Sequence, residues 1–212
     1  MFTFGTWWEW YAQQKKLDPV KGGQNWQELR YNLTWSYDLD AIASTFHLGY
    51  IFYTYPNNKG WNTQEWWFGL DHNDAWMWKK WWPDNEEGVL NPTFRFYQDL
   101  RRAGANTAWM EIGVSHEFQV CRNTTMTPSW TLGIDHDFYA EWTGMSRDNT
   151  TRFGNMLWGL DITYDLTERL ALPANWGNMS LTGSIYFSDA LGNAEDDGAI
   201  QDEFYGGLAF GW

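Results

Sequence analysis

The stretch 28–39, ELRYNLTWSYDL, alternates strictly between polar and apolar residues. Leu, Tyr and Trp hold every odd position, and Glu, Arg, Asn, Thr, Ser and Asp hold every even one. Successive side chains of a β-strand point to opposite faces, so this pattern predicts a strand with one apolar and one polar face. The stretch 156–166, MLWGLDITYDL, repeats the pattern with apolar residues at even positions. Each apolar face runs over about ten residues, the length that a tilted strand needs to cross hydrocarbon.

The same periodicity continues along the chain and predicts eight further strands, near 2–12, 42–55, 63–72, 90–100, 107–120, 129–139, 179–188 and 202–212. Single-chain bacterial barrels have an even number of strands. We therefore expect an all-β fold, a closed antiparallel up-and-down transmembrane β-barrel of about ten strands, with 1–212 as one domain. A soluble β-sandwich is the alternative, although its strands are usually shorter. A helical fold is excluded, because period two scatters apolar residues around a helix.

Composition narrows the class of protein. Aromatic residues make up 20% of the chain, with 18 Trp, yet the mean hydropathy is -0.58. No run of apolar residues is long enough for a helical membrane span. The formal net charge of -13 argues against nucleic-acid binding, which needs a basic surface. A single cysteine, Cys121, excludes an intramolecular disulfide.

The connections contain one exception to the barrel pattern. Five polar outer loops are expected at 13–25, 56–62, 101–106, 140–154 and 189–201, and inner turns at 40–41, 73–89, 121–128 and 167–178. The connection 73–89 contains AWMWKKWW at 75–82. It could be a short helix lying flat at a membrane interface, a plug, or an extension of the neighbouring strands.

The last residues, 205–212, read YGGLAFGW. Tyr205, Gly207, Phe210 and Trp212 resemble, at the same spacing, the terminal signal that the barrel-assembly machinery recognises. The resemblance implies that this machinery is a partner during biogenesis. An aromatic strand that happens to end the chain is the alternative.

Four other segments resemble the TorF-type outer-membrane porin family: GYIFYTYP at 49–56, NTQE at 62–65, LNPT at 90–93 and EIGVSH at 111–116. The resemblance covers the middle half of the chain loosely and implies a barrel in the bacterial outer membrane, in contact with its lipid. It transfers no catalytic residue, and the Trp-rich connection departs from the family. No basic-then-apolar leader begins this chain, so we expect the export signal to have been removed.

The polar face would line the lumen, and it is mostly acidic. Its candidate lining residues are Glu28, Arg30, Glu65, Trp67, Arg95, Tyr97, Trp109, Glu111, Asp135, Asp161 and Asp165. Arg30 and Arg95 are the only basic residues on this face of the predicted strands, so we expect them to bridge carboxylates. A lumen filled by side chains and a narrow cation-leaning path are both open. Glycines on this face, such as Gly49 and Gly159, are expected to serve sheet curvature.

The first functional hypothesis is therefore a narrow porin that passes small solutes or ions. A non-conducting structural or adhesive barrel that binds glycan, lipid or protein through its loops is the second, and an outer-membrane enzyme is the third. We expect no catalytic residue, metal or cofactor. Asp135, His136 and Asp137 would suit acid–base chemistry, but neighbours in a strand face opposite ways. The acidic loop 195–198 is expected to be solvated rather than a calcium site.

Overall fold

A computed structural model describes residues 1–10, 26–55, 62–84, 86–101, 107–138, 150–167, 169–170, 173, 177–191 and 202–211. The side chains of residues 7–10 and 26–28 lie outside this description. The chain divides into two compact units, which are described separately below. Unit 1 contains Met1–Leu70, Arg95–Trp109 and His136–Thr150. Unit 2 contains Asp71–Phe94, Met110–Asp135 and Thr151–Trp212. The predicted outer loops, including the acidic loop 195–198, lie largely outside the described residues.

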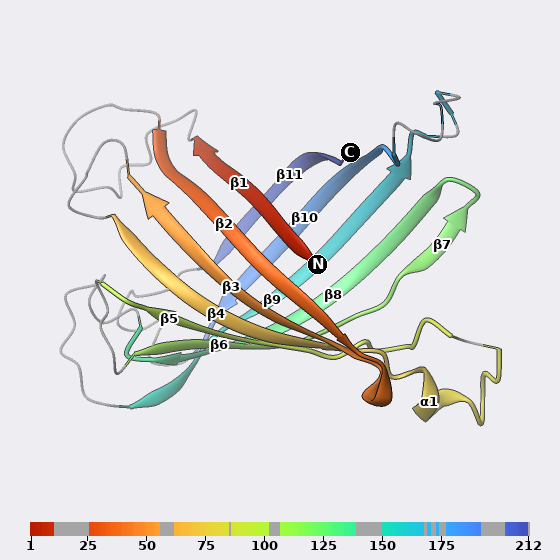
Figure 1. The fold of residues 1–212 in the computed structure, drawn as a ribbon, viewed down its shortest axis with the longest axis horizontal. Coiled ribbons are helices and arrows are strands. Elements are labelled where there is room, and N and C mark those ends of the chain that lie inside the picture. Colours follow the sequence, from red (N-terminus) through yellow and green to blue (C-terminus); the bar gives the residue numbers. More distant parts are fainter. Residues whose placement is uncertain are drawn as a thin grey trace. The chain divides into compact units, whose positions relative to one another are not determined.

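Most of the described chain is antiparallel strand (Figure 1). In chain order the elements are β1 (Phe2–Trp10), β2 (Trp26–Leu39), the 3-10 turn η1 (Asp40–Ile42), β3 (Ser44–Thr54), β4 (Thr63–His72), α1 (Ala75–Trp78), β5 (Thr93–Asp99), β6 (Ala108–Ser115), β7 (Phe118–Cys121), β8 (Thr124–His136), β9 (Thr151–Asp165), β10 (Ser180–Ala190) and β11 (Glu203–Gly211). Ten strands pair in the order β1-β2-β3-β4-β5-β6-β8-β9-β10-β11, and β7 pairs with β8 beside this path. The all-β, up-and-down part of the prediction is confirmed.

Closure of the sheet is not seen. β1 and β11 are the first and last strands of the order, and no pairing joins them among the described residues. The sequence could not decide this point for a physical reason. Alternation fixes which face a side chain takes, and an open sheet and a closed one satisfy it equally.

The stretch predicted as one strand at 107–120 is two strands. β6 ends at Ser115, and β7 starts at Phe118 and turns back into β8 at residues 122–123. The predicted inner turn 121–128 is therefore wrong, because most of it belongs to β8. Pro128 lacks an N–H donor, but it still takes part in the pairing, because its carbonyl oxygen accepts a hydrogen bond from the His116 amide at 3.2 Å.

The Trp-rich connection between β4 and β5 forms a short helix followed by turns. α1 covers only Ala75–Trp78, while β4 ends at His72 and β5 starts at Thr93. The extension of the neighbouring strands is therefore wrong for this segment. No helix in the described ranges has the length and apolar character needed to cross a membrane.

The apolar faces of the strands are exposed. In unit 1, Phe2 and Phe4 of β1 lie opposite Trp35 and Leu33 of β2, and all four side chains are exposed. In unit 2 the same holds for the face that β9, β10 and β11 share, where Leu208 is 82% exposed. Few large apolar side chains are buried among the described residues, whereas several Asp, Glu and Thr side chains are.

Candidate functional site

On the polar face of unit 1, a hydrogen bond joins the start of β4 to the end of β5. Thr63 of β4 donates its hydroxyl to Oδ2 of Asp99 of β5 at 2.6 Å, and both side chains are fully buried. The backbone amide of Arg101 donates to the other oxygen of Asp99 at 2.8 Å. Such bonds satisfy a carboxylate that burial would otherwise penalise.

A second group joins three strands of unit 1. Arg30 of β2 lies directly opposite Tyr53 of β3, with its guanidinium carbon 5.3 Å from the centre of the tyrosine ring. The Tyr53 hydroxyl donates to the buried carboxylate of Glu65 on β4 at 2.8 Å. Arg30 and Glu65 were both predicted on this face, whereas Tyr53 was missed. Tyr53 has an odd number, like Gly49 of the same strand, and this parity could have placed it on the polar face.

Trp67 of β4 is the centre of a third, aromatic group in unit 1. Its ring stacks on His47 of β3 at 6.2 Å and packs against Tyr97 of β5 at 6.0 Å between centroids. The guanidinium carbon of Arg95 lies 5.8 Å from the Trp67 ring centre, within cation–π range. Trp67, Arg95 and Tyr97 were predicted to share one face, and the structure brings them together there.

The two arginines that were predicted to bridge carboxylates, Arg30 and Arg95, both lie over aromatic rings. Arg95 also donates to the Leu70 carbonyl oxygen at 3.3 Å. The expectation that Arg30 and Arg95 are the only basic residues on this face is wrong. Arg152 of β9 was placed in an outer loop, but β9 begins at Thr151. At this end of the strand the exposed Phe153 has an odd number, whereas the exposed Trp158 and Ile162 have even numbers, so the parity changes and Arg152 reaches the polar face.

Arg152 forms an ion pair on the polar face of unit 2. Its Nε atom lies 2.9 Å from Oδ2 of Asp135 on β8. The Asp135 side chain is 1% exposed, and that of Arg152 is 16% exposed. A buried carboxylate with a charged donor at this distance makes a strong hydrogen bond. The Asp135–Arg152 pair therefore neutralises one of the predicted lumen carboxylates.

A second polar group in unit 2 follows β9, β10 and β11. The Tyr186 hydroxyl donates to Oδ1 of Asp161 at 2.9 Å, and the Tyr186 ring stacks on Tyr205 at 5.3 Å. Asp161 thus lies on the polar face, as the alternation indicated, and is hydrogen-bonded there. Asp165, at the end of β9, is exposed and accepts a hydrogen bond from the Thr167 amide at 2.7 Å, so it ends the strand.

Glycines on the polar face leave room for large side chains of adjacent strands. A Cβ atom on Gly69 would stand 2.5 Å from Cδ of Arg95, and one on Gly159 would stand 2.7 Å from Cε1 of Tyr186. Gly49 makes the same room for Trp67. The space beside these glycines is therefore occupied by side chains of the adjacent strands.

The other predicted lining residues lie on β2 and β6, and the predicted assembly signal ends the chain. Trp109 is buried at the start of β6, and Glu111 is half-buried on the same strand. The side chain of Glu28 and the whole of Trp212 lie outside the described residues. Phe210 is exposed on the apolar face of β11, and Gly207 has nothing within 4 Å of an added Cβ.

A buried carboxylate, missed at the sequence level, organises the Trp-rich connection of unit 2. Asp74 accepts hydrogen bonds from the amides of Val89, Leu90 and Asn91, the shortest at 2.7 Å, and from the Trp78 indole at 2.8 Å. Burial alone would raise the pKa of Asp74, but these hydrogen bonds outweigh it and lower that pKa below its usual 3.8. Asp74 is therefore ionised at neutral pH and fixes both ends of the connection.

No protein-family model, curated protein or solved structure significantly matches this chain. The resemblance to TorF-type porins therefore stays a prediction.

Proposed function

We propose that this chain is a bacterial outer-membrane β-barrel that passes small ions or solutes along a narrow, cation-leaning path. The observation that carries the proposal is the inverted distribution of its side chains. Soluble monomers rarely expose contiguous apolar patches of more than a few hundred Å². Here exposed apolar residues follow strand after strand, as with Tyr31, Leu33 and Trp35 in unit 1 and Trp158 and Ile162 in unit 2. Hydrocarbon is the solvent that such faces match.

The proposal requires β1 to pair with β11 in the membrane. Within a bilayer an open sheet edge leaves backbone N–H and C=O groups unpaired, and each costs several kcal/mol. Both terminal strands carry exposed apolar residues, Phe4 on β1 and Leu208 on β11, so both suit contact with lipid.

Cysteine cross-linking in phospholipid vesicles tests this closure, with Cys121 first replaced by Ser. Cysteine at Phe4 would be combined in turn with cysteine at Phe204, Leu208 or Phe210, which share the apolar face of β11. We expect one combination to form an intramolecular disulfide. Phe4 with Leu33, its direct partner in β2, is the positive control. A protein in which only the control pair forms would contradict closure.

The cation preference follows from the carboxylates of the polar face. The Asp161 carboxylate accepts a hydrogen bond from the Tyr186 hydroxyl, which is a neutral donor. Carboxylates along a path attract cations and repel anions. Planar-bilayer recording under a KCl gradient tests the preference, and we expect a reversal potential of the sign for K⁺ selectivity. Asp161→Asn should reduce that potential, while Thr163→Ser, on the same face of β9, should leave it unchanged. Folded protein without conductance steps in any salt would exclude the porin function.

A non-conducting barrel is the second candidate, and the packing around Trp67 favours it. His47, Tyr97 and Arg95 pack against this ring, and Gly49 closes on its edge. A lumen filled in this way along its length would block ions and leave a structural or adhesive role. Conductance recording separates the two candidates, and catalysis forms no part of either.

The outer membrane and its assembly machinery enter as part of the same proposal. Support comes from β11, where Phe210 and Leu208 lie exposed on the apolar face of a terminal strand. The spacing of Tyr205, Gly207 and Phe210 resembles an assembly signal, and other segments resemble TorF-type porins. Fractionation of a bacterium that expresses the chain with an export signal tests this location. Recovery in the soluble periplasmic fraction would contradict it.

A further inference from the structure

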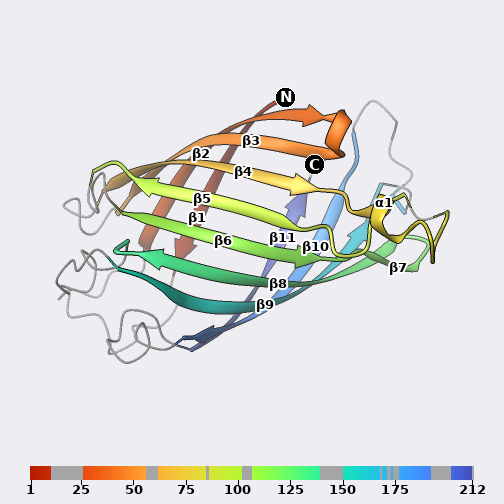
Figure 2. The ribbon, with the colours of Figure 1, turned by 90° about the horizontal axis from the view of Figure 1, so that it is seen from below.

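Four exposed side chains of the Trp-rich connection form an apolar surface, which we call the tryptophan platform: Trp76, Met77, Trp81 and Trp82. Trp76 and Trp81 are each 63% exposed, and the other two are more than half exposed. The platform belongs to unit 2, at the strand end where the Ser115 amide bonds the Leu90 carbonyl oxygen at 2.8 Å. Figure 2 shows α1 and β7 at this same end.

The indole of Trp78 supports part of the tryptophan platform. Trp78 donates its indole N–H to the buried Asp74, and its ring packs 5.9 Å from those of Trp81 and Trp82. The Trp82 amide also donates to the Trp78 carbonyl oxygen at 2.9 Å. Because Trp78 packs against Trp81 and Trp82, these two indoles are presented as a preorganised surface, which lowers the cost of ordering them on binding.

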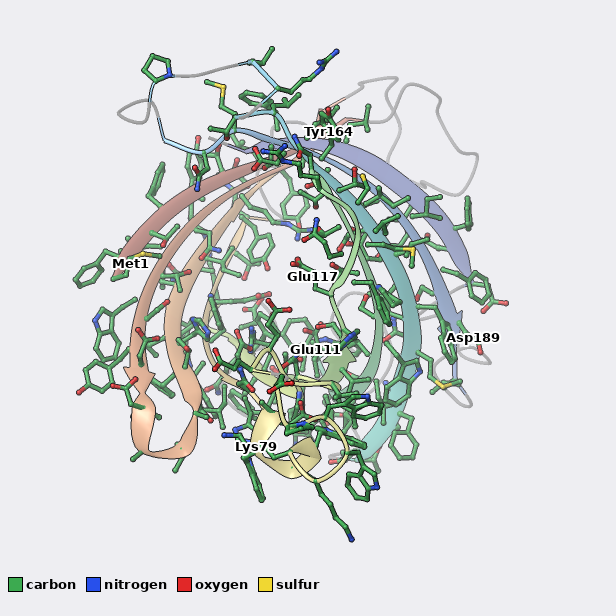
Figure 3. The ribbon with its side chains drawn as sticks, turned by 90° about the vertical axis from the view of Figure 1, so that its right-hand side faces the viewer. Met1, Lys79, Glu111, Glu117, Tyr164 and Asp189 are labelled. Atoms are coloured by element: carbon green, nitrogen blue, oxygen red, sulfur yellow. The ribbon has the colours of Figure 1, made fainter. Side chains whose placement is uncertain are left out.

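Two lysines complete the chemistry of this surface. Lys79 and Lys80 are the only lysines among the described residues of a chain with a net charge of -13. Lys79 follows α1 directly (Figure 3). The Lys80 ammonium lies 5.7 Å from the ring centre of Trp81. The exposed carboxylates of Asp84, Glu86 and Glu87 come only after Pro83, on the returning arm.

We propose that the tryptophan platform binds the headgroup layer of an anionic phospholipid membrane. Indole rings favour the boundary between headgroups and acyl chains, and lysine stems bury their methylenes while the ammonium reaches phosphate. A second copy of this chain is a poorer occupant, because it would meet the platform with the same two lysines, Lys79 and Lys80, and like charges repel each other. This inference rests on the proposed membrane function and adds the lipid class that this end of the chain contacts.

Depth-dependent fluorescence quenching tests the proposal on the full chain reconstituted in vesicles. Cys121→Ser removes the native thiol, and Met77→Cys carries an environment-sensitive label. The vesicles contain phosphatidylcholine alone or mixed with phosphatidylglycerol. Interfacial segments reach only about 5–10 Å below the surface, so we expect lipid brominated near the headgroup to quench about three-fold more than lipid brominated deeply. Asp84→Cys is the control, whose label should be quenched by aqueous iodide.

Phosphatidylglycerol should increase quenching at Met77, and K79Q/K80Q should remove that increase, whereas D84N/E86Q should retain it. A Met77 label as open to iodide as the Asp84 label would overturn the proposal. So would protection from both iodide and lipid that grows with protein concentration, which would indicate a second copy. A label at Ile185, on the apolar face of β10, distinguishes failure of this inference from failure of the proposed membrane function. If deep lipid quenches the Ile185 label but no lipid quenches the Met77 label, only this inference is contradicted. If deep lipid does not quench the Ile185 label, the membrane function itself is contradicted.

Discussion

Trp67 of β4 lies in the space that a side chain on Gly49 of β3 would fill. A Cβ atom on Gly49 would stand 2.8 Å from Cζ2 of the indole and closer still to Nε1. That nitrogen is buried and has no hydrogen-bond partner among the described residues. The ring is therefore fixed by shape and stacking, with no polar bond at its edge to restore its position if it is displaced.

Gly49→Ala should lower the free energy of unfolding by about 1–3 kcal/mol, the usual cost of overpacking. The new methyl group must displace Trp67, which in turn disturbs His47 and Arg95. Denaturant titration of the protein in phospholipid vesicles, followed by tryptophan fluorescence, measures the change.

Gly183→Ala is the matched control for that substitution. Its Cβ atom would meet only Cδ2 of Leu208 at 3.6 Å, an ordinary contact. Alanine also restricts the unfolded chain, so we expect this variant to be neutral or slightly stabilised. Equal losses for the two variants would indicate that both glycines serve backbone curvature and that the fit with Trp67 is unimportant.

Leu160→Arg tests which face of β9 meets hydrocarbon. Leu160 pairs with Ile185 on the apolar face, and a charge there at the middle of a bilayer should cost about 2–4 kcal/mol. Asp161→Asn, one residue on, keeps an oxygen that can accept from Tyr186 and should cost much less. The free energy of unfolding in vesicles compares them. Equal costs would contradict the assignment of faces.

The Asp135–Arg152 pair predicts non-additive losses. Arg152→Met leaves the buried Asp135 carboxylate without this partner and should cost about 3 kcal/mol. Replacing both residues, as D135L/R152M, should cost less than either single change, because no buried charge remains. A double-mutant cycle of unfolding free energies measures the coupling, and additive losses would show that the pair is energetically independent.

The alternation of polar and apolar residues predicted the strands well, because the backbone geometry of a strand places successive side chains on opposite faces. The bounds of β4 agree with the prediction at both ends, at Thr63 and His72. The prediction was wrong around β8, where 121–128 was expected to be an inner turn. Pairing of β8 with β7 and a hydrogen bond to the Pro128 carbonyl oxygen make most of this segment strand. Closure of the sheet could not be determined from the sequence, since no local pattern indicates whether the first and last strands pair.

The polar groups were predictable by face but not by partner. Alternation placed Trp67 and Arg95 together, yet stacking between them depends on strand register, which the sequence does not state. Asp74 was missed because its acceptor role depends on amides fifteen to seventeen residues away. Such a contact exists only once the connection has folded back on itself.

Asp74→Asn should loosen the Trp-rich connection without unfolding the strands. The amide can offer only one oxygen, so the N–H groups of Val89, Leu90 and Asn91 lose acceptors at a local cost of about 1–3 kcal/mol. Amide hydrogen exchange over 86–91, measured in vesicles, should rise in this variant. Asp84→Asn, exposed on the same connection, should leave that exchange unchanged.

Acid should reproduce the effect of Asp74→Asn in the unmodified chain. The pKa of Asp74 is lower in the folded protein than its usual 3.8, so ionised Asp74 stabilises the connection at every pH above that value. This stability is lost only as the pH falls below 3.8 through the lowered pKa of the folded state. Exchange over 86–91 should therefore be constant from neutral pH to about pH 5 once the intrinsic rate is divided out, and should rise in stronger acid. Asp74→Asn should show no such rise. A connection that loosens between pH 5 and 7 would mean that another group controls it.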